Sequence, residues 1–195
     1  MVALAPLEAA HLGRVAAIQA AVYPPCYNED ARLILSRAAA YPSGHLVAML
    51  EDGDVVAYAS AYPWPLAAAL AAPPSLGALD VARIRAADAA PDSAALFLHE
   101  VSVYAQGVGV GAAIVDALLA HAEARGFRAA VLVCVLGNEK YYERWGFEAV
   151  RALPPYAMEA PAPAPVEGAL PPTASHFSTF LGATLMRLSL PRQKF

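Results

Sequence analysis

Residues 96–136 carry the pattern that most restricts how this chain can fold. An apolar run at 96–103 is typical of a buried strand, and a glycine-rich turn at 106–111 follows it. Val110, Ile114 and Leu118 then recur at helical spacing, and a second apolar run occupies 128–136. A strand–helix–strand unit of about 40 residues predicts a parallel crossover, and hence an α/β fold.

The remaining segments predict the other elements of a single domain over residues 1–195. Helices are expected at 8–21 and, after an N-cap at Asn28, up to about residue 40. Strands at 45–50 and 55–62 flank the turn 51–54, which is a hairpin signal. A short helix at 139–145, a strand at 147–150 and a last strand at 183–190 complete the pattern.

Two Pro/Ala-rich stretches, at about 63–93 and 152–174, are expected to be long loops, the first with a short helix near 79–87. They lie outside a core of about residues 96–150.

Composition argues against several classes of protein. Although 58% of the residues are hydrophobic, no apolar run reaches the roughly 18–20 residues that a membrane span needs. The net charge is −4 and no basic cluster is present, so neither a membrane nor a nucleic acid is an expected partner. Cys26 and Cys134 do not form a metal-spaced pair, and no secretory leader pattern is seen, so the expected location is cytoplasmic.

The glycine-rich turn has a chemical interpretation. Glycines between a strand and a helix allow backbone N–H groups to point at an anion, and the helix N-terminus adds partial positive charge. The spacing Gly107-x-Gly109-x-Gly111 fits neither a Walker A loop nor a dinucleotide fingerprint. Taken alone, the glycines are also compatible with a simple tight turn.

The surrounding residues give the turn a context. Leu98-x-x-Val101-x-Val103 followed by Gln106-x-x-Gly109-x-Gly111 resembles the acyl-CoA-binding motif of the GNAT acetyltransferase superfamily, and the segment from Asn138 to Phe147 resembles the family's Asn…Tyr-x-x-x-Gly-Phe. Two linkers are shorter than the family's: only Tyr104-Ala105 separate Val103 from Gln106, and Asn138 lies close to Tyr142.

The resemblance implies a mixed, mostly antiparallel central sheet, split near the strand 96–103, with helices on both faces. It also implies that acetyl-CoA is the co-substrate, and no metal site is expected. The residues that it assigns to the cofactor lie on the motif strand, the turn, the helix start and the downstream asparagine. They are Val101, Ser102, Val103, Gln106, Gly107, Val108, Gly109, Val110, Gly111, Ala112 and Asn138.

Acetyl transfer to an amine requires a base, a stabilised oxyanion and an acid for the leaving thiolate. The resemblance makes Tyr142 the acid, with Tyr141 as its competitor, and a backbone N–H near residues 101–103 the oxyanion partner. It makes His99 the base, because strand alternation places His99 with Phe97, Val101 and Val103 on one face. Glu100 becomes the base only if a bulge flips the register. The alternatives are that His99 is a hydrogen-bonded core histidine and that Glu100 is a solvated or salt-bridged residue.

The acceptor pocket is expected among aromatic and acidic residues of the N-terminal third and the segment after the hairpin: Tyr23, Tyr27, Glu29, Tyr62 and Trp64. Aromatic rings suit a flat or cationic amine, although the same residues are also ordinary core residues. The expected function is therefore N-acetylation of a small-molecule amine. The alternatives are acyl transfer to a peptide or protein amine, and a non-catalytic module that binds CoA or an amine. The oligomeric state is left open, with a homodimer as the candidate.

Overall fold

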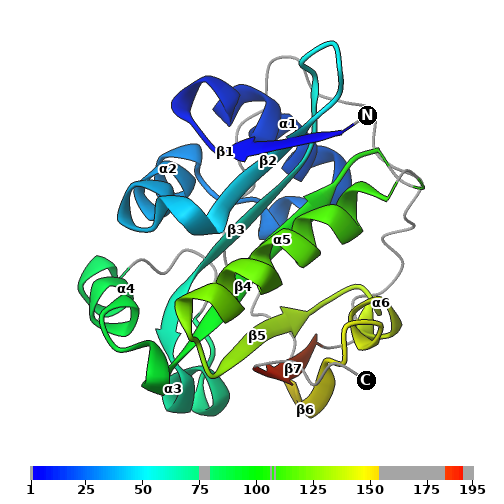
Figure 1. Ribbon diagram of the computed structural model, residues 1–195. Coiled ribbons are helices and arrows are strands. Elements are labelled where there is room, and N and C mark those ends of the chain that lie inside the picture. Colours follow the sequence, from blue (N-terminus) through cyan, green and yellow to red (C-terminus); the bar gives the residue numbers. More distant parts are fainter. Residues whose placement is uncertain (1, 75–79, 106, 108, 154–182, 191–195) are drawn as a thin grey trace.

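The fold is built on one mixed sheet, seen in a computed structural model that describes residues 2–74, 80–105, 107, 109–153 and 183–190 (Figure 1). Seven strands follow the order β1-β2-β3-β4-β5-β7-β6. Their bounds are β1 Ala3–Pro6, β2 His45–Met49, β3 Val55–Pro65, β4 Ala94–Val103, β5 Ala129–Cys134, β6 Glu148–Leu153 and β7 Ala183–Ser189. Only β4 and β5 pair in parallel, so the predicted mixed, mostly antiparallel sheet is confirmed.

Helices connect and cover these strands. Their bounds are α1 Leu12–Val22, α2 Ala31–Ala40, α3 Leu66–Ala71, α4 Val81–Asp88, α5 Val110–Arg125 and α6 Glu139–Glu143, with 3-10 turns at Ala9–His11, Pro25–Tyr27, Pro42–Gly44 and Pro91–Ser93. α5 ends at Gly126, whose φ of 77° is the left-handed conformation that glycine adopts without strain. Within the described ranges, no helix has the length and hydropathy to cross a bilayer.

Alternating residues of the sheet bury against helices on its two faces. Tyr58 of β3 belongs to a core cluster with residues of α1 and α2, such as Ile18 and Ile34. Its neighbour Ala57 belongs to the larger cluster that contains Ile114 and Leu118 of α5. Figure 1 shows α5 lying across the sheet. Helices therefore cover both faces, as predicted.

The sheet divides between β4 and β5. Their parallel pairing runs from Ala95 opposite Ala129 to Leu98 opposite Leu132 and then stops. β4 continues beside β3 as far as Val103, opposite Ala57. The unpaired half of β4 and the end of β5 therefore form a fork, which is the split that the sequence predicts at this strand.

The sequence predicts a long irregular loop at 63–93, whereas the structure has regular elements there. β3 continues to Pro65, and α3, α4 and a 3-10 turn follow. Prolines are tolerated there because β2 pairs with β3 only as far as Ser60, which leaves β4 as the single strand partner of Pro63 and Pro65. The alanine-rich residues after Pro65 then form a short helix, in keeping with the helix propensity of alanine.

Other elements also differ from the prediction. The strand β1 is an addition that the sequence does not predict. The N-cap of α2 is Asp30 rather than Asn28, and the Asp30 side chain accepts a hydrogen bond from the Arg32 N–H. The predicted strand at 147–150 is longer, at Glu148–Leu153. Nearly all of the predicted loop 152–174 lies outside the described residues.

Candidate active site

A cavity of about 810 Å³ opens at the fork between β4 and β5. Its wall is formed by β4 residues 97–103, β5 residues 132–134, the start of α5, the end of α1 and α6. The cavity thus brings together the two motif segments that are separated in the sequence by about 30 residues.

A β-bulge at His99 decides which side chains of β4 face which side of the sheet. Ser60 of β3 lies opposite Glu100, whereas the next residue, Ala61, lies opposite Leu98, so His99 is the extra residue. Beyond the bulge, the alternation of β4 is reversed. Glu100 therefore shares a face with Ser60 and His99, and the predicted single face for Phe97, His99, Val101 and Val103 is wrong.

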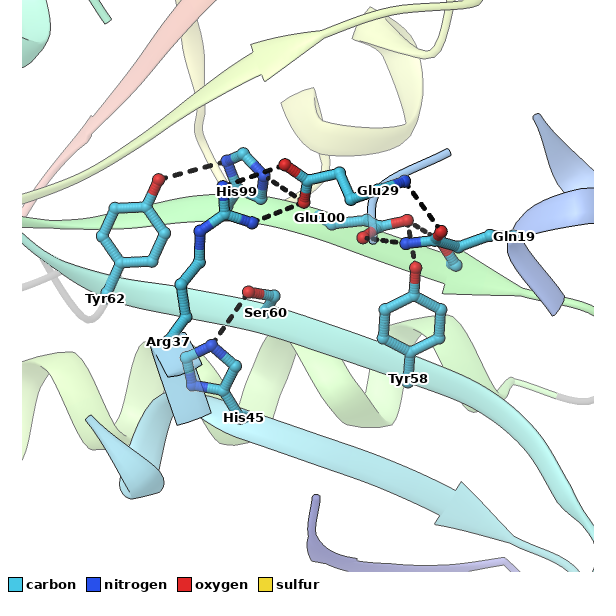
Figure 2. Close-up of polar contacts among 10 residues, drawn as sticks. Gln19, Glu29, Arg37, His45, Tyr58, Ser60, Tyr62, His99 and Glu100 are labelled. Atoms are coloured by element: carbon cyan, nitrogen blue, oxygen red, sulfur yellow. Dashed lines mark hydrogen bonds and ion pairs between the residues drawn. The ribbon is translucent and has the colours of Figure 1, made fainter. Parts of the chain in front are cut away.

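Glu100 lies buried in the cavity wall and accepts several hydrogen bonds (Figure 2). Tyr58 and Ser102 donate to its Oε1, the latter at 2.8 Å, and the Gln19 amide donates to Oε2 at 3.2 Å. Burial raises the pKa of Glu100 to about 7, and the charge of Glu29 acts in the same direction, while the three donors oppose it. A carboxyl with this pKa exchanges protons near neutral pH.

His99 is held in a separate cluster of charges. Its Nε2 lies 2.8 Å from Glu29 Oε2 and its Nδ1 lies 3.2 Å from the Tyr62 hydroxyl (Figure 2). Arg37 donates to both oxygens of Glu29, at 2.5 and 2.9 Å. The His99 side chain is only 2% exposed, so the residue borders the cavity while its imidazole is engaged elsewhere.

Burial by itself would raise the pKa of Glu29. The opposing effects of His99 and Arg37, acting through charge and hydrogen bonds, together bring the pKa far below its usual range. Glu29 is therefore an ionised partner within the protein, with a side chain 4% exposed.

Tyr142 and Tyr141 both reach the cavity from α6. Burial raises the pKa of Tyr142 well above its usual range, and the nearby Cys134 and Tyr141 add to this, so its hydroxyl stays protonated at neutral pH. Tyr141 lies against the first turn of α5: a Cβ added to Gly111 would come within 2.6 Å of its hydroxyl oxygen. The two tyrosines are packed edge to face.

Two glycines of the turn between β4 and α5 adopt left-handed backbone angles. Gly107 and Gly109 have φ angles of 81° and 77°, which a residue with a Cβ adopts only with strain. The N-cap of α5 is Gly109, which has no side chain, and among the described residues no side-chain hydrogen bond to the first amides of the helix is seen. This arrangement fits an anionic group of a ligand. Gln106 and Val108 lie outside the described residues.

The other residues expected to hold the cofactor all border the cavity. They are Val101, Ser102, Val103, Gly107, Gly109, Val110, Gly111, Ala112 and Asn138. Among the described residues, no group of histidine, cysteine and acidic side chains is arranged to hold a metal ion.

The residues expected in the acceptor pocket are divided by the structure. Tyr23 and Tyr27 border the cavity and pack edge to face, with ring centroids 6.3 Å apart. Glu29, Tyr62 and Trp64 are not part of its wall. Glu29 and Tyr62 belong to the His99 cluster, and Trp64, only 5% exposed, packs under the Arg83 guanidinium.

Sequence reasoning missed several residues of the site. Gln19, Arg37 and Tyr58 contact the two buried carboxylates, and Arg144 borders the cavity. A polar residue at a helix position that should be buried, as Gln19 is among the apolar residues of α1, was the signal available for one of them.

Comparisons with known proteins bear on the family and the fold. The model of the acetyltransferase (GNAT) family matches residues 13–147. No curated protein sequence matches the chain significantly.

Solved structures share the fold at low sequence identity. Naa20 of Chaetomium thermophilum, in complex with a bisubstrate analogue, is 16% identical over 96% of this chain and 86% of that one, with a TM-score of 0.63. The ribosomal-protein-S18-alanine N-acetyltransferase of Escherichia coli is also 16% identical, over 100% and 97% of the chains, at 0.60. The polyamine N-acetyltransferase of Drosophila melanogaster is 16% identical over 97% and 100%, at 0.63.

Proposed function

Because this chain belongs to the GNAT acetyltransferase family, an acetyl-CoA-dependent family, we propose that it transfers the acetyl group of acetyl-CoA to the primary amine of a small molecule, with Glu100 as base and Tyr142 as acid. The observation that carries the proposal is the bulge at His99, which puts a buried carboxyl of suitable pKa into the wall of the cavity beside the glycine turn.

The reaction follows from the positions of these groups. The acceptor ammonium loses a proton to the Glu100 carboxylate, and its nitrogen then attacks the thioester carbonyl carbon. As the C–S bond breaks, the Tyr142 hydroxyl donates a proton to the departing sulfur, so the products are the N-acetylated amine and the thiol of CoA. Backbone N–H groups of residues 101–103 are suited to stabilise the oxyanion, because β4 lacks β5 as a partner there.

The charges in the cavity wall favour an acceptor with one amine on an apolar body. Among the described residues of the wall, Glu100 is the only acid and Arg144 the only arginine or lysine. The end of α1 and the segment after it add Val22, Tyr23 and Tyr27. Asp30 caps α2 and Glu29 is paired within the protein. A second ammonium of a polyamine would find no acidic side chain other than Glu100 in the described part of the wall, and burying an unpaired charge is costly.

The amine class is tested by measuring thiol release from acetyl-CoA with a panel of acceptors. We expect phenylethylamine and hexylamine to be acetylated with kcat/KM at least ten times that for spermidine. The panel also includes peptides as acceptors, because the similar Escherichia coli enzyme is named for a protein alanine. A peptide amine preferred over every small amine would contradict the small-molecule assignment. Absence of heat on titration with acetyl-CoA would contradict any function in CoA binding.

The base is tested by Glu100→Gln, which removes the proton-accepting group at nearly constant volume. We expect kcat/KM to fall about 10²–10⁴-fold, the usual contribution of a general base, and the rise of activity through pH 7 to disappear. Glu148→Gln on the exposed strand β6 is the matched control and should leave the profile unchanged. If His99→Gln instead abolishes the rise while Glu100→Gln retains it, His99 is the base.

A further inference from the structure

Gln19 is the one polar residue among the buried residues of α1. It is 1% exposed and lies one residue after the fully buried Ile18. A buried amide that found no hydrogen-bond partners would cost stability, so its contacts explain why it is tolerated. Both ends of the Gln19 side chain are in fact engaged with groups beside the cavity (Figure 2).

The orientation of the Gln19 amide is fixed by one of these contacts. The backbone N–H of Glu29 donates to Gln19 Oε1 at 3.0 Å. Because a backbone N–H can only donate, the oxygen of the amide must lie on that side, and the nitrogen must lie on the other. Gln19 Nε2 therefore donates to Glu100 Oε2, at 3.2 Å.

The two oxygens of Glu100 are not equivalent. Oε1 accepts from both Tyr58 and Ser102, which uses both of its lone pairs. Oε2 accepts from Gln19 and keeps a second lone pair for another donor. The oxygen with this remaining capacity is the one suited to receive the proton of an acceptor amine.

We infer that Gln19 is a positioning residue for the acetyl transfer: its amide pins Glu100 Oε2 as the proton-accepting atom and stabilises the ionised carboxylate. This inference rests on the proposed role of Glu100 as base. Gln19 also links that base to the backbone of Glu29, two residues after Tyr27 of the cavity wall. One side chain therefore fixes the position of the carboxylate relative to this part of the wall.

Other groups act on Glu100 from each element packed around it. Tyr58 of β3 and Ser102 of β4 donate to it, and Tyr23, directly after α1, interacts with its charge. The negative charge of Glu29 opposes ionisation of Glu100, and Arg37 of α2 also interacts with its charge. Gln19 is the only donor to Oε2 among the described residues, so removing it changes one defined contact.

The test is the pH dependence of kcat/KM in Gln19→Met, which keeps the volume of the side chain and removes the amide. Loss of the donor disfavours the carboxylate, so its pKa rises and the acidic limb should move to higher pH. A hydrogen bond to a charged group commonly corresponds to about one to two pKa units, and we expect about one unit for this long contact. Tyr58→Phe should move the limb in the same direction.

Val15→Ala is the matched control, because it loosens the same buried face of α1 without touching Glu100. The acidic limb of kcat/KM in this variant should stay at the same pH, even if the variant unfolds at a lower temperature. A folded Gln19→Met with an unmoved limb would overturn the inference, and Gln19→Asn, whose shorter amide cannot span both contacts, serves the same purpose if Gln19→Met does not fold. Retention of the limb in Glu100→Gln would instead refute the proposed base.

Discussion

Tyr142 shows how burial suits a single residue to one half of a proton transfer. Its raised pKa means that the hydroxyl remains a donor through the whole neutral range. Glu100 shows the complementary case, because the same effect of burial brings a carboxyl to a pKa near 7. Two groups whose pKa values are moved to different regions by their surroundings are a recurring arrangement in acid–base catalysis.

Replacing Tyr142 with phenylalanine should therefore lower kcat while leaving the affinity for acetyl-CoA nearly unchanged. We expect a loss of about 10²-fold, typical for removal of a general acid, measured by thiol release under saturating substrates. Tyr141→Phe is the matched control on the same helix and should retain most of the activity. An unaltered kcat in Tyr142→Phe would show that the thiolate leaves without this hydroxyl.

Individual residues also show where sequence interpretation stops. Tyr23, Tyr27 and Glu100 were predicted near the site and do border the cavity. Glu29 was predicted to attract the substrate, yet Arg37, eight residues later on α2, pairs with both of its oxygens. Such a pairing depends on how α2 packs over the sheet and leaves no periodic mark in the sequence.

At the scale of elements, the strand–helix–strand unit was predictable because its hydrophobic periods are strong and its turn is marked by glycines. The bulge in β4 was not, since one extra residue within Phe97-Leu98-His99-Glu100 changes no composition and carries no glycine or proline. Yet this bulge exchanges the faces of every later residue of the strand. Pro63 and Pro65 gave a wrong prediction for a different reason. Prolines are typical of a loop, but here β3 continues through them with β4 as its single partner.

The junction of α5 with α6 gives a prediction about two elements in contact. Gly111→Ala places a Cβ within 2.6 Å of the Tyr141 hydroxyl and 3.1 Å of a Val103 methyl, so the Tyr141 side chain must move away from the first turn of α5. We expect weaker binding of acetyl-CoA, measured by titration calorimetry, because both helices border the cavity.

The double variant Gly111→Ala/Tyr141→Phe removes the nearer obstacle and should recover part of the affinity. Gly13→Ala in α1, where an added Cβ meets nothing within 4 Å, should instead stabilise the protein by about 0.5–1 kcal/mol. If Gly111→Ala binds acetyl-CoA as the unaltered protein does, the junction is not part of the binding site.

At the scale of the whole molecule, two buried groups give the stability opposite dependences on pH. Burial lowers the pKa of His45 from 6.5 to about 4, so its unfolded form takes up a proton first and stability falls as the pH drops through this window. The pKa of Glu100 is raised from 4.5 to about 7, so stability falls as the pH rises between these values. The two slopes largely cancel between about pH 4.5 and 6.5.

Glu100→Gln should remove one of these slopes and so stabilise the protein while inactivating it. The gain in the free energy of unfolding should be small near pH 4.5 and reach as much as about 3 kcal/mol above pH 7, from a difference of about 2.5 pKa units. Urea unfolding at several pH values measures it, with Glu148→Gln as the reference. A gain that is the same at every pH would mean that ionisation of Glu100 does not strain the fold.

The fork between β4 and β5 has a consequence for how copies of this protein behave toward one another. A strand with unpaired backbone groups normally promotes aggregation, because a strand from a second molecule can pair with it in the plane of the sheet. Here the unpaired half of β4 faces β5 of its own sheet across the cavity. A strand from a second molecule would therefore have to enter this cavity before it could pair with the free half of β4, so the open hydrogen-bonding groups stay within the cavity wall.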